Sequence, residues 1–305
     1  MERIILDVDT GLDDAAALLL AAGLEELHIE AVIATAGNVG LSKTLENTLN
    51  IMETVGADCP VFRGADKPLL RDPVEAGDFH GVTGMDGPTF GPRVLQHVQE
   101  ENGIDALIRL LKENPHQLTV VSVGPLTDLA LAMAKEEGIA LLAKEIVIMG
   151  GSFSYGNVTK VAEFNTYADP EAAQIVFSSG ANITLFPLDC TRTVTLTKER
   201  LDAYRRKAGR ATEVFAACMD TYMANYEKKG QGWPQIHDPL CVAYLADPTK
   251  VECESAPVAV DIEEGTSYGQ TVKLTADDTS KIRIARSIDI PWFWSLVERA
   301  LDTLS

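Results

Sequence analysis

The sequence predicts an open, mainly parallel, Rossmann-like α/β sheet flanked by helices, with a helical and hairpin elaboration towards the C-terminus. Two observations carry this prediction. Short apolar runs of strand-forming residues recur through most of the chain, and segments with helical periodicity lie between them. Because alternating strands and helices are typical of βαβ crossovers, neighbouring strands are expected to run parallel.

Five apolar runs are the expected strands of this sheet. In open sheets of this kind, ligands bind beyond the carboxyl ends of the strands. The residues that follow each run are therefore the first candidates for chemistry. The runs cover residues 4–8, 31–34, 118–123, 145–149 and 183–186.

Helical patterns fill the intervals between these runs. The expected helices include residues 13–22, 42–55 and 105–112. Another helix is expected to begin at Pro170, because proline is favoured in a first helical turn.

The later part of the chain has a different character. Residues 197–230 have a charged helical pattern, residues 257–274 alternate like a hairpin around Glu264-Gly265, and a terminal helix is expected to begin at Trp292. No internal repeat or Pro/Ser-rich linker interrupts the sequence. Residues 1–305 are therefore expected to form a single domain.

The charge balance limits the partners of this chain. Lys and Arg number 26 against 45 Asp and Glu, which gives a formal net charge of −19. Such a field repels polyphosphates and nucleic acid, whereas a neutral substrate or a cation suits it. We therefore expect a small-molecule substrate and no nucleic-acid partner.

Targeting features and a disulfide framework are not expected. No stretch of roughly 18 uncharged apolar residues occurs, and the N-terminus lacks the pattern of a signal peptide. The five cysteines are widely spaced and form no Cys-x-x-Cys pair. We therefore expect a cytoplasmic protein that makes no contact with a membrane.

The strongest local signal is the segment Asp7-Val8-Asp9-Thr10-Gly11-Leu12-Asp13-Asp14, which places four carboxylates in eight residues between the first strand and the first helix. Carboxylates this close raise each other's pKa unless a cation or a helix N-terminus compensates them. A hard cation such as Ca²⁺, which takes several oxygen ligands in flexible geometry, would compensate the charges of these carboxylates. Asp9 and Asp14 could both bind it from one short loop.

Two other interpretations of this cluster remain open at this point. Asp13 and Asp14 could simply cap the helix, because acidic residues are common in a first turn. Asp7-x-Asp9 after a first strand also resembles the haloacid-dehalogenase-type phosphatases, with Asp7 as nucleophile and Asp9 as acid/base. That family usually has threonine or valine where this chain has Gly11.

The aspartate segment also resembles the opening signature of the inosine/uridine-type nucleoside hydrolases. Further blocks similar to that family follow in its order along nearly the whole chain, and such a series is hard to obtain by chance. The blocks are Ala36-Gly37-Asn38, His80-Gly81-x-x-Gly84, Gly124-Pro125-Leu126-Thr127, Met149-Gly150-Gly151, Ala162-Glu163-Phe164-Asn165, Asp169-Pro170-Glu171-Ala172-Ala173 and His237-Asp238-Pro239.

This resemblance implies a role for each candidate residue in cleaving the bond between a base and its ribose. Calcium would be held by Asp9, Asp14, Asp238 and the backbone carbonyl of Val123. The substrate would be bound by Asp13, Asn38 and Asn165 at the ribose hydroxyls, by Glu163 and Asn157 on the 5′ side, and by Phe164 and His80. His237 would protonate the departing base, with His80 as the alternative donor.

The implied mechanism uses a calcium-bound water that loses a proton to Asp9 as it attacks the anomeric carbon. A calcium-dependent nucleoside-binding protein without turnover is a further alternative. The resemblance also implies a homodimer or homotetramer. Thr10 replaces a frequent proline and Asp128 a frequent asparagine, and Tyr222, Tyr226 and Trp233 lie in the segment expected to face the base, whose purine or pyrimidine identity stays open.

Overall fold

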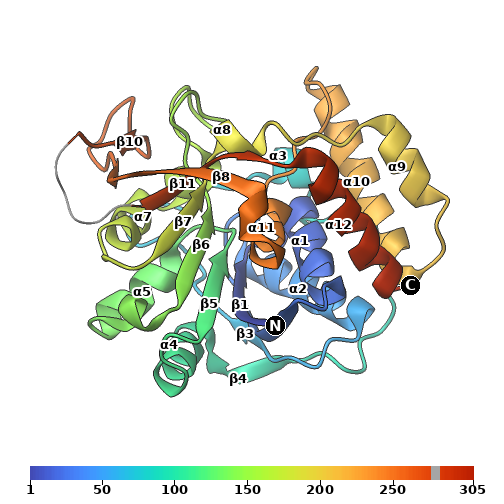
Figure 1. The fold of residues 1–305 in the computed structure, drawn as a ribbon, viewed down its shortest axis with the longest axis horizontal. Coiled ribbons are helices and arrows are strands. Elements are labelled where there is room, and N and C mark those ends of the chain that lie inside the picture. Colours follow the sequence, from blue (N-terminus) through green and yellow to red (C-terminus); the bar gives the residue numbers. More distant parts are fainter. Residues whose placement is uncertain (276–281) are drawn as a thin grey trace.

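The computed structural model describes residues 1–275 and 282–305, and its centre is a nine-stranded sheet (Figure 1). The strand order is β4-β3-β2-β1-β5-β6-β7-β11-β8. Neighbouring strands are parallel except β11 and β8, which are antiparallel. The strands are β1 Glu2–Val8, β2 Leu27–Ala34, β3 Val61–Arg63, β4 Val98–Asn102, β5 Leu118–Ser122, β6 Glu145–Met149, β7 Ile183–Phe186, β8 Val251–Ala256 and β11 Ile282–Ile288.

Helices cover both faces of the sheet (Figure 1). On one face α1 packs against α2, α10, α11 and α12, and on the other α5 packs against α4 and α7. The larger helices are α1 Leu12–Gly23, α2 Leu41–Val55, α4 Gly103–Glu113, α5 Thr127–Lys135, α7 Pro170–Phe177, α9 Lys198–Arg205, α10 Arg210–Lys228, α11 Pro239–Ala246 and α12 Ile290–Thr303. Shorter helices are α3 Gly77–His80, α6 Phe164–Ala168 and α8 Leu188–Thr191, with 3₁₀ turns η1 Ile139–Leu142 and η2 Pro248–Lys250.

The Ala/Leu-rich helix α1 is buried along nearly its whole length. A helix that is apolar on all sides needs neighbours all round, and α2, α10, α11 and α12 supply them. Its first turn carries Asp13 and Asp14, which are consequently buried as well. The fold therefore draws two carboxylates into the interior at the carboxyl end of β1.

The predicted mainly parallel α/β sheet is confirmed. The five expected strands and the helices at 13–22, 42–55, 105–112 and 170 correspond to β1, β2, β5, β6, β7, α1, α2, α4 and α7. Residues 257–274 contain the antiparallel pair β9 Val258–Val260 and β10 Thr271–Lys273. The terminal helix begins at Ile290 rather than Trp292, because Asp289 caps it by accepting a hydrogen bond from Trp292 N.

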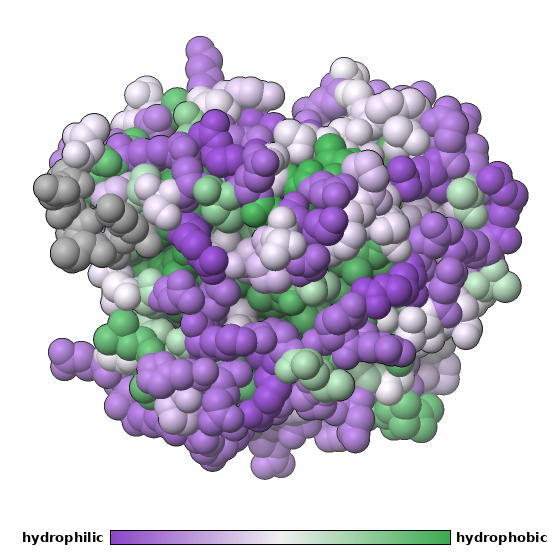
Figure 2. Space-filling view, in the orientation of Figure 1, coloured by the Kyte–Doolittle hydropathy of each residue, from purple (hydrophilic) through white to green (hydrophobic). Residues whose placement is uncertain are grey.

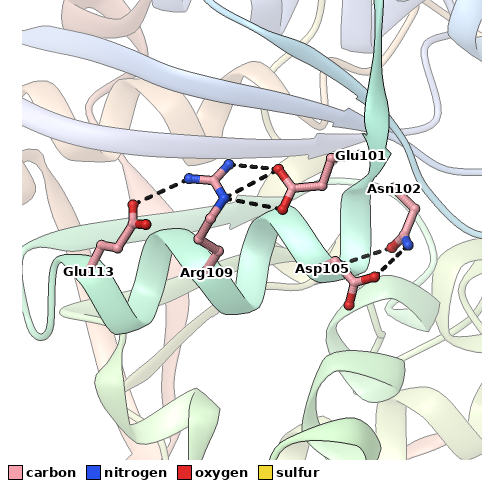
Figure 3. A network of polar contacts seen from close by, with 5 residues as sticks. All are labelled: Glu101, Asn102, Asp105, Arg109 and Glu113. Atoms are coloured by element: carbon pink, nitrogen blue, oxygen red, sulfur yellow. Dashed lines mark hydrogen bonds and ion pairs between the residues drawn. The ribbon is translucent and has the colours of Figure 1, made fainter.

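A polar network holds β4 against the start of α4 (Figure 3). Asn102 caps α4, because its Oδ1 accepts a hydrogen bond from Asp105 N at 2.9 Å. One turn further, Arg109 pairs with Glu101 at 2.8 Å and with Glu113 at 3.2 Å. The helix therefore begins at Gly103, two residues before the expected start.

The surface agrees with the acidic, charge-rich composition. Figure 2 shows a face dominated by hydrophilic residues, with apolar residues exposed mainly as small separate patches. Within the described part of the chain, no helix has the length and apolarity needed to cross a membrane.

Candidate active site

A cavity of about 570 Å³ opens at the carboxyl ends of β1, β5 and β6, where ligands were expected from the sheet type. Asp9 follows β1, Val123 follows β5 and Met149 ends β6. Nearly all residues singled out in the sequence line this cavity. They are Asp9, Asp13, Asn38, His80, Val123, Asn157, Glu163, Phe164, Asn165, His237 and Asp238.

Four aspartates from distant parts of the chain meet beside this cavity. Oxygen atoms of Asp13, Asp14 and Asp238 all lie within 4.8 Å of one another. Asp9 adjoins them, because its backbone N lies 3.2 Å from Asp14 Oδ1. The structure therefore brings Asp238, at the start of α11, to the aspartates of the β1–α1 loop.

These carboxylates are buried and mutually repulsive. Burial raises the pKa of all four, and that of Asp13 reaches about 8. Neighbouring negative charges add to the effect, most clearly at Asp238, where Asp13, Asp14, Asp9 and Glu163 all contribute to the raised pKa. Ionising the group without a compensating positive charge is therefore unfavourable.

The side chains of the cavity supply little positive charge. Among the described residues that line it, Arg192 is the one arginine or lysine, and its guanidinium donates to the carbonyls of Tyr155 and Gly156 at 2.7 and 2.9 Å. The grouped oxygens of Asp13, Asp14 and Asp238 form an all-oxygen donor set, which is the set that hard divalent cations prefer, and Val123 lines the same cavity. The residues present therefore fit a hard divalent cation.

Asn38 organises the aspartate loop. Its backbone N donates to Asp9 Oδ2 at 2.7 Å, and its Nδ2 donates to the Asp9 carbonyl at 3.1 Å and to Asp14 Oδ2 at 3.0 Å. The side-chain NH₂ is thus committed to the aspartates, which leaves Oδ1 for a ligand. A β-carbon at neighbouring Gly37 would lie 2.1 Å from Asp9 Oδ2, so only glycine leaves this carboxylate in place.

A buried layer behind the loop was not visible in the sequence. Thr10 Oγ1 lies 2.7 Å from Thr48 Oγ1 on α2, and Asn47 Nδ2 donates to the carbonyls of Thr10 and Thr83 at 3.0 Å each. The Thr10 hydroxyl therefore fixes the loop to α2 by hydrogen bonding. No local pattern marks Thr48 or Asn47 as partners of that loop.

The side of the cavity formed by residues 157–165 is held by polar caps. Glu163 caps α6, accepting hydrogen bonds from the backbone N of Asn165, Thr166 and Gly151 at 2.8 to 3.1 Å. Asn157 Oδ1 accepts from Phe164 N at 2.9 Å, and Asn165 Nδ2 donates to the Val123 carbonyl at 2.7 Å. These side chains support the cavity wall as well as lining it.

The two histidines of the cavity differ in their partners. His80 Nδ1 accepts a hydrogen bond from Leu12 N at 3.1 Å, and a backbone N–H can only donate, so the proton of this ring is on Nε2. Burial lowers the pKa of His80 to about 4. His237 Nδ1 lies 2.8 Å from the hydroxyl of Thr191, and burial, with Arg192 and His80 adding to it, lowers the pKa of His237 to about 3.

Aromatic side chains form another part of the lining. The rings of Tyr222 and Tyr226 lie 5.0 Å apart edge to face, and Tyr222 lies 5.9 Å from the ring of His80. Trp233 and Tyr155 line the cavity and remain exposed, at 45% and 59%. Such rings provide flat apolar surfaces on which a planar group can stack.

Asp7 belongs to a different environment. It does not line the cavity, is 1% exposed, and accepts a hydrogen bond from Ser122 at 2.8 Å. Burial and the adjoining Asp128 raise its pKa. A phosphatase nucleophile has to reach its substrate, so the absence of Asp7 from the cavity lining argues against the dehalogenase-type interpretation.

Comparison with known proteins gives one consistent result. Residues 4–295 match the family model of the inosine-uridine preferring nucleoside hydrolases. The chain is 37% identical to the pyrimidine-specific ribonucleoside hydrolase RihB of Escherichia coli O17:K52:H18 (strain UMN026), over 98% of this chain and 96% of that one.

Solved structures agree with this match. A purine-preferring ribonucleoside hydrolase from Gardnerella vaginalis is similar with a TM-score of 0.94 and 31% identity, covering 99% of each chain. A plant nucleoside hydrolase, the PpNRh1 enzyme, is similar with a TM-score of 0.91 and 28% identity, covering 98% of this chain and 99% of that one.

Proposed function

Because the chain belongs to the inosine-uridine preferring nucleoside hydrolase family, we propose how its own residues carry out the hydrolysis of ribonucleosides to free base and ribose. Enzymes of this class are N-glycosyl hydrolases. The observation that carries the proposal is the group of buried aspartates Asp13, Asp14 and Asp238, with Asp9 adjoining it, beside a cavity of about 570 Å³. Arg192 is the one arginine or lysine in the described lining of this cavity.

We assign the metal to Asp9, Asp14, Asp238 and the carbonyl of Val123, with calcium as the ion. The donor set supports this choice, because calcium accepts several carboxylate and carbonyl oxygens in flexible geometry. When bound, calcium would compensate the aspartate charges and make a water molecule in the cavity more acidic. Asn38, Asn165 and Gly37 keep these oxygens in position.

Asp9 is the general base that takes the proton of the attacking water, and Asp13 accepts hydrogen bonds from the ribose hydroxyls. The free Oδ1 of Asn38 and the side chains of Asn157, Glu163, Phe164 and Asn165 surround the remainder of the sugar. Cleavage passes through an oxocarbenium-like state with positive charge on the ribose. The anionic cavity therefore stabilises the transition state more than the neutral substrate.

The rings of His80 and His237 are both neutral before a substrate binds, since burial lowers the pKa of each. His237 is the proton donor to the departing base once the negative charge that develops on that base favours the charged ring, and His80 remains a neutral hydrogen-bond donor beside it. Leu12 N occupies Nδ1 of His80, so protonating that nitrogen would break the contact. The hydroxyl partner of His237 can donate to a bare nitrogen or accept from a protonated one. The two rings are therefore suited to different roles.

An assay of products tests this proposal. The purified protein is incubated with uridine, cytidine, inosine and adenosine, and with UMP, and both reducing sugar and inorganic phosphate are measured. We expect ribose from nucleosides and no phosphate from UMP. Phosphate from UMP would instead indicate a phosphatase, and neither product would indicate a nucleoside-binding protein without turnover.

The same assay ranks the bases. The E. coli relative is named pyrimidine-specific and the Gardnerella relative purine-preferring. We propose the pyrimidine preference, because the identity to the former is higher, at 37% against 31%. A higher kcat/KM for uridine than for inosine supports this assignment, and the reverse ranking contradicts it.

We further propose a cytoplasmic homodimer or homotetramer that works without nucleic acid or membrane. Support comes from the family resemblance and from the acidic composition. Light scattering coupled to size-exclusion chromatography measures the assembly directly, and a monomer would contradict it.

A further inference from the structure

Thr191 is the last residue of α8, and its side chain contacts His237 although 46 positions separate the two in sequence. The distance from Thr191 Oγ1 to His237 Nδ1 is 2.8 Å, and both residues are buried. Among the described residues, His237 is the one hydrogen-bond partner of the Thr191 hydroxyl. Nothing in the local sequence of either residue indicates the contact.

Backbone hydrogen bonds close to both residues fix the position of Thr191 relative to His237. Ile236 N donates to the Val194 carbonyl and Leu196 N to the Pro234 carbonyl, each at 2.9 Å. These antiparallel contacts join the segment after α8 to the segment before His237. The approach of Thr191 to the ring is therefore a consequence of the fold rather than of one flexible rotamer.

We propose that Thr191 is a positioning residue for departure of the base: its hydroxyl holds the imidazole of His237 so that Nε2 faces the leaving group. The inference rests on the proposed role of His237 as proton donor. The two ring nitrogens point in different directions, so with Nδ1 held by Thr191 the other nitrogen is the one left for a ligand.

The surroundings of Nε2 agree with this orientation. His237 lines the cavity, and Nε2 is neither hydrogen bonded to a described residue nor among the buried unpaired atoms. It therefore faces the space that a substrate would fill. Without the Thr191 hydroxyl, the ring would lose the contact that fixes its rotation about the Cβ–Cγ bond.

Three variants test the proposal on two substrates. Thr191→Val keeps the side-chain shape without the hydroxyl, Thr191→Ser keeps the hydroxyl, and Thr193→Val removes a nearby exposed hydroxyl that donates to the Cys190 carbonyl instead. Departure of uracil from uridine is expected to be assisted by protonation, because the uracil anion is more basic than p-nitrophenolate. A p-nitrophenyl riboside does not, because p-nitrophenol is acidic enough to leave as the anion.

Thr191→Val is expected to lower kcat on uridine about 10- to 100-fold, with KM and turnover of the p-nitrophenyl riboside within about threefold of wild type. Thr191→Ser is expected to restore most of the uridine activity, and Thr193→Val to match wild type on both substrates. In a His237→Ala background, Thr191→Val should cost nothing further, because both changes remove the same function. Melting temperatures of all variants exclude misfolding as the cause.

An equal loss on both substrates, or no loss on uridine, would overturn the role of Thr191 while His237→Ala still discriminates between the substrates. If His237→Ala itself slowed both substrates equally, the role of His237 as proton donor would fail, and the inference about Thr191 with it. The two failures are therefore distinguishable in one set of measurements.

Discussion

Asp7 and Asp9 are two residues apart but have different environments. Asp9 lines the cavity and contacts Asn38 and Asp14, whereas Asp7 is buried beside Ser122 and Asp128. The sequence identifies the aspartate segment as chemically important. It does not separate the two roles, because the partner Asp128 comes from a distant part of the chain.

Matched substitutions at these two aspartates separate chemistry from structure. Asp9→Ala should lower kcat by about three orders of magnitude or more, because it removes the proposed base and a metal ligand. Asp7→Asn should keep kcat within about threefold, since its amide can still bond to Ser122 and Asp128. Steady-state rates on uridine measure both, and an inactive Asp7→Asn enzyme with wild-type stability would contradict the account.

Asp128, which adjoins Asp7, is a buried carboxyl whose charge affects the stability of the folded state. Burial raises its pKa to about 6, and its Oδ2 and Asp7 Oδ1 have no other partner within the described chain. One proton shared between the two carboxyls satisfies both atoms. Above that pKa Asp128 ionises, whereas Asp7, whose pKa is raised further, keeps the shared proton. Ionisation of Asp128 costs stability, because the unfolded chain holds that proton less tightly.

The pH dependence of unfolding tests this pair. Since the pKa of Asp128 is higher in the folded state, its favourable contribution is present at low pH and is lost as the pH rises from about 4 to about 6. Asp128→Asn should therefore become more stable than wild type over that interval, by about 1 to 3 kcal/mol or a few degrees at pH 7. Thermal melts at pH 4 to 8 check this, and a variant that melts lower at pH 7 would contradict it.

At the scale of elements, the loop after β2 determines where the Asp9 carboxylate lies. A β-carbon at Gly37 would meet Asp9 Oδ2 at 2.1 Å, whereas one at Gly40 would have its nearest contact at 3.6 Å, with Glu75 Oε1. Gly37→Ala should therefore weaken calcium binding and lower kcat at least about tenfold, and Gly40→Ala should match wild type. Calcium titration and uridine kinetics measure both, and equal effects of the two changes would contradict this reading of the loop.

The elements that the sequence predicts are those with a strong local pattern. The runs that became β6 and β7 have the predicted bounds, since each is a short and mostly apolar segment of strand-forming residues. β3 has three residues and the edge strand β4 is largely polar, so neither has a periodicity that identifies it. Both are strands because β2 and β3 present free edges to them, which is a property of the assembled sheet.

The candidate site was also predictable only in part, because contacts between distant residues leave no local pattern in the sequence. The carboxylates and histidines could be chosen because the family resemblance identified them, and the structure places them around one cavity. The residues that hold these side chains in place could not be predicted from the sequence. The contacts Thr10–Thr48 and Thr191–His237 join residues 38 and 46 positions apart, and threonines have no distinctive pattern.

On the scale of the whole molecule, the fold buries several negatively charged side chains in the interior, where an uncompensated charge is most unfavourable. The chain carries a net charge of −19, and the α1 packing buries two of the four clustered aspartates. This arrangement is unfavourable without a counterion and becomes favourable with one. Stability and metal binding are therefore expected to be linked, and a ligand that binds the native state alone raises the melting temperature.

The melting temperatures of wild type and Asp238→Asn, with a chelator and with calcium, test the central claim that these aspartates hold one divalent cation. Calcium should raise the wild-type value by about 3 to 8 °C and leave Asp238→Asn unchanged. In the chelator, Asp238→Asn should melt higher than wild type, because one of four repelling carboxylates is gone, and Asp7→Asn should keep the calcium response. A wild-type protein indifferent to calcium, or an Asp238→Asn variant stabilised as much as wild type, would contradict the claim.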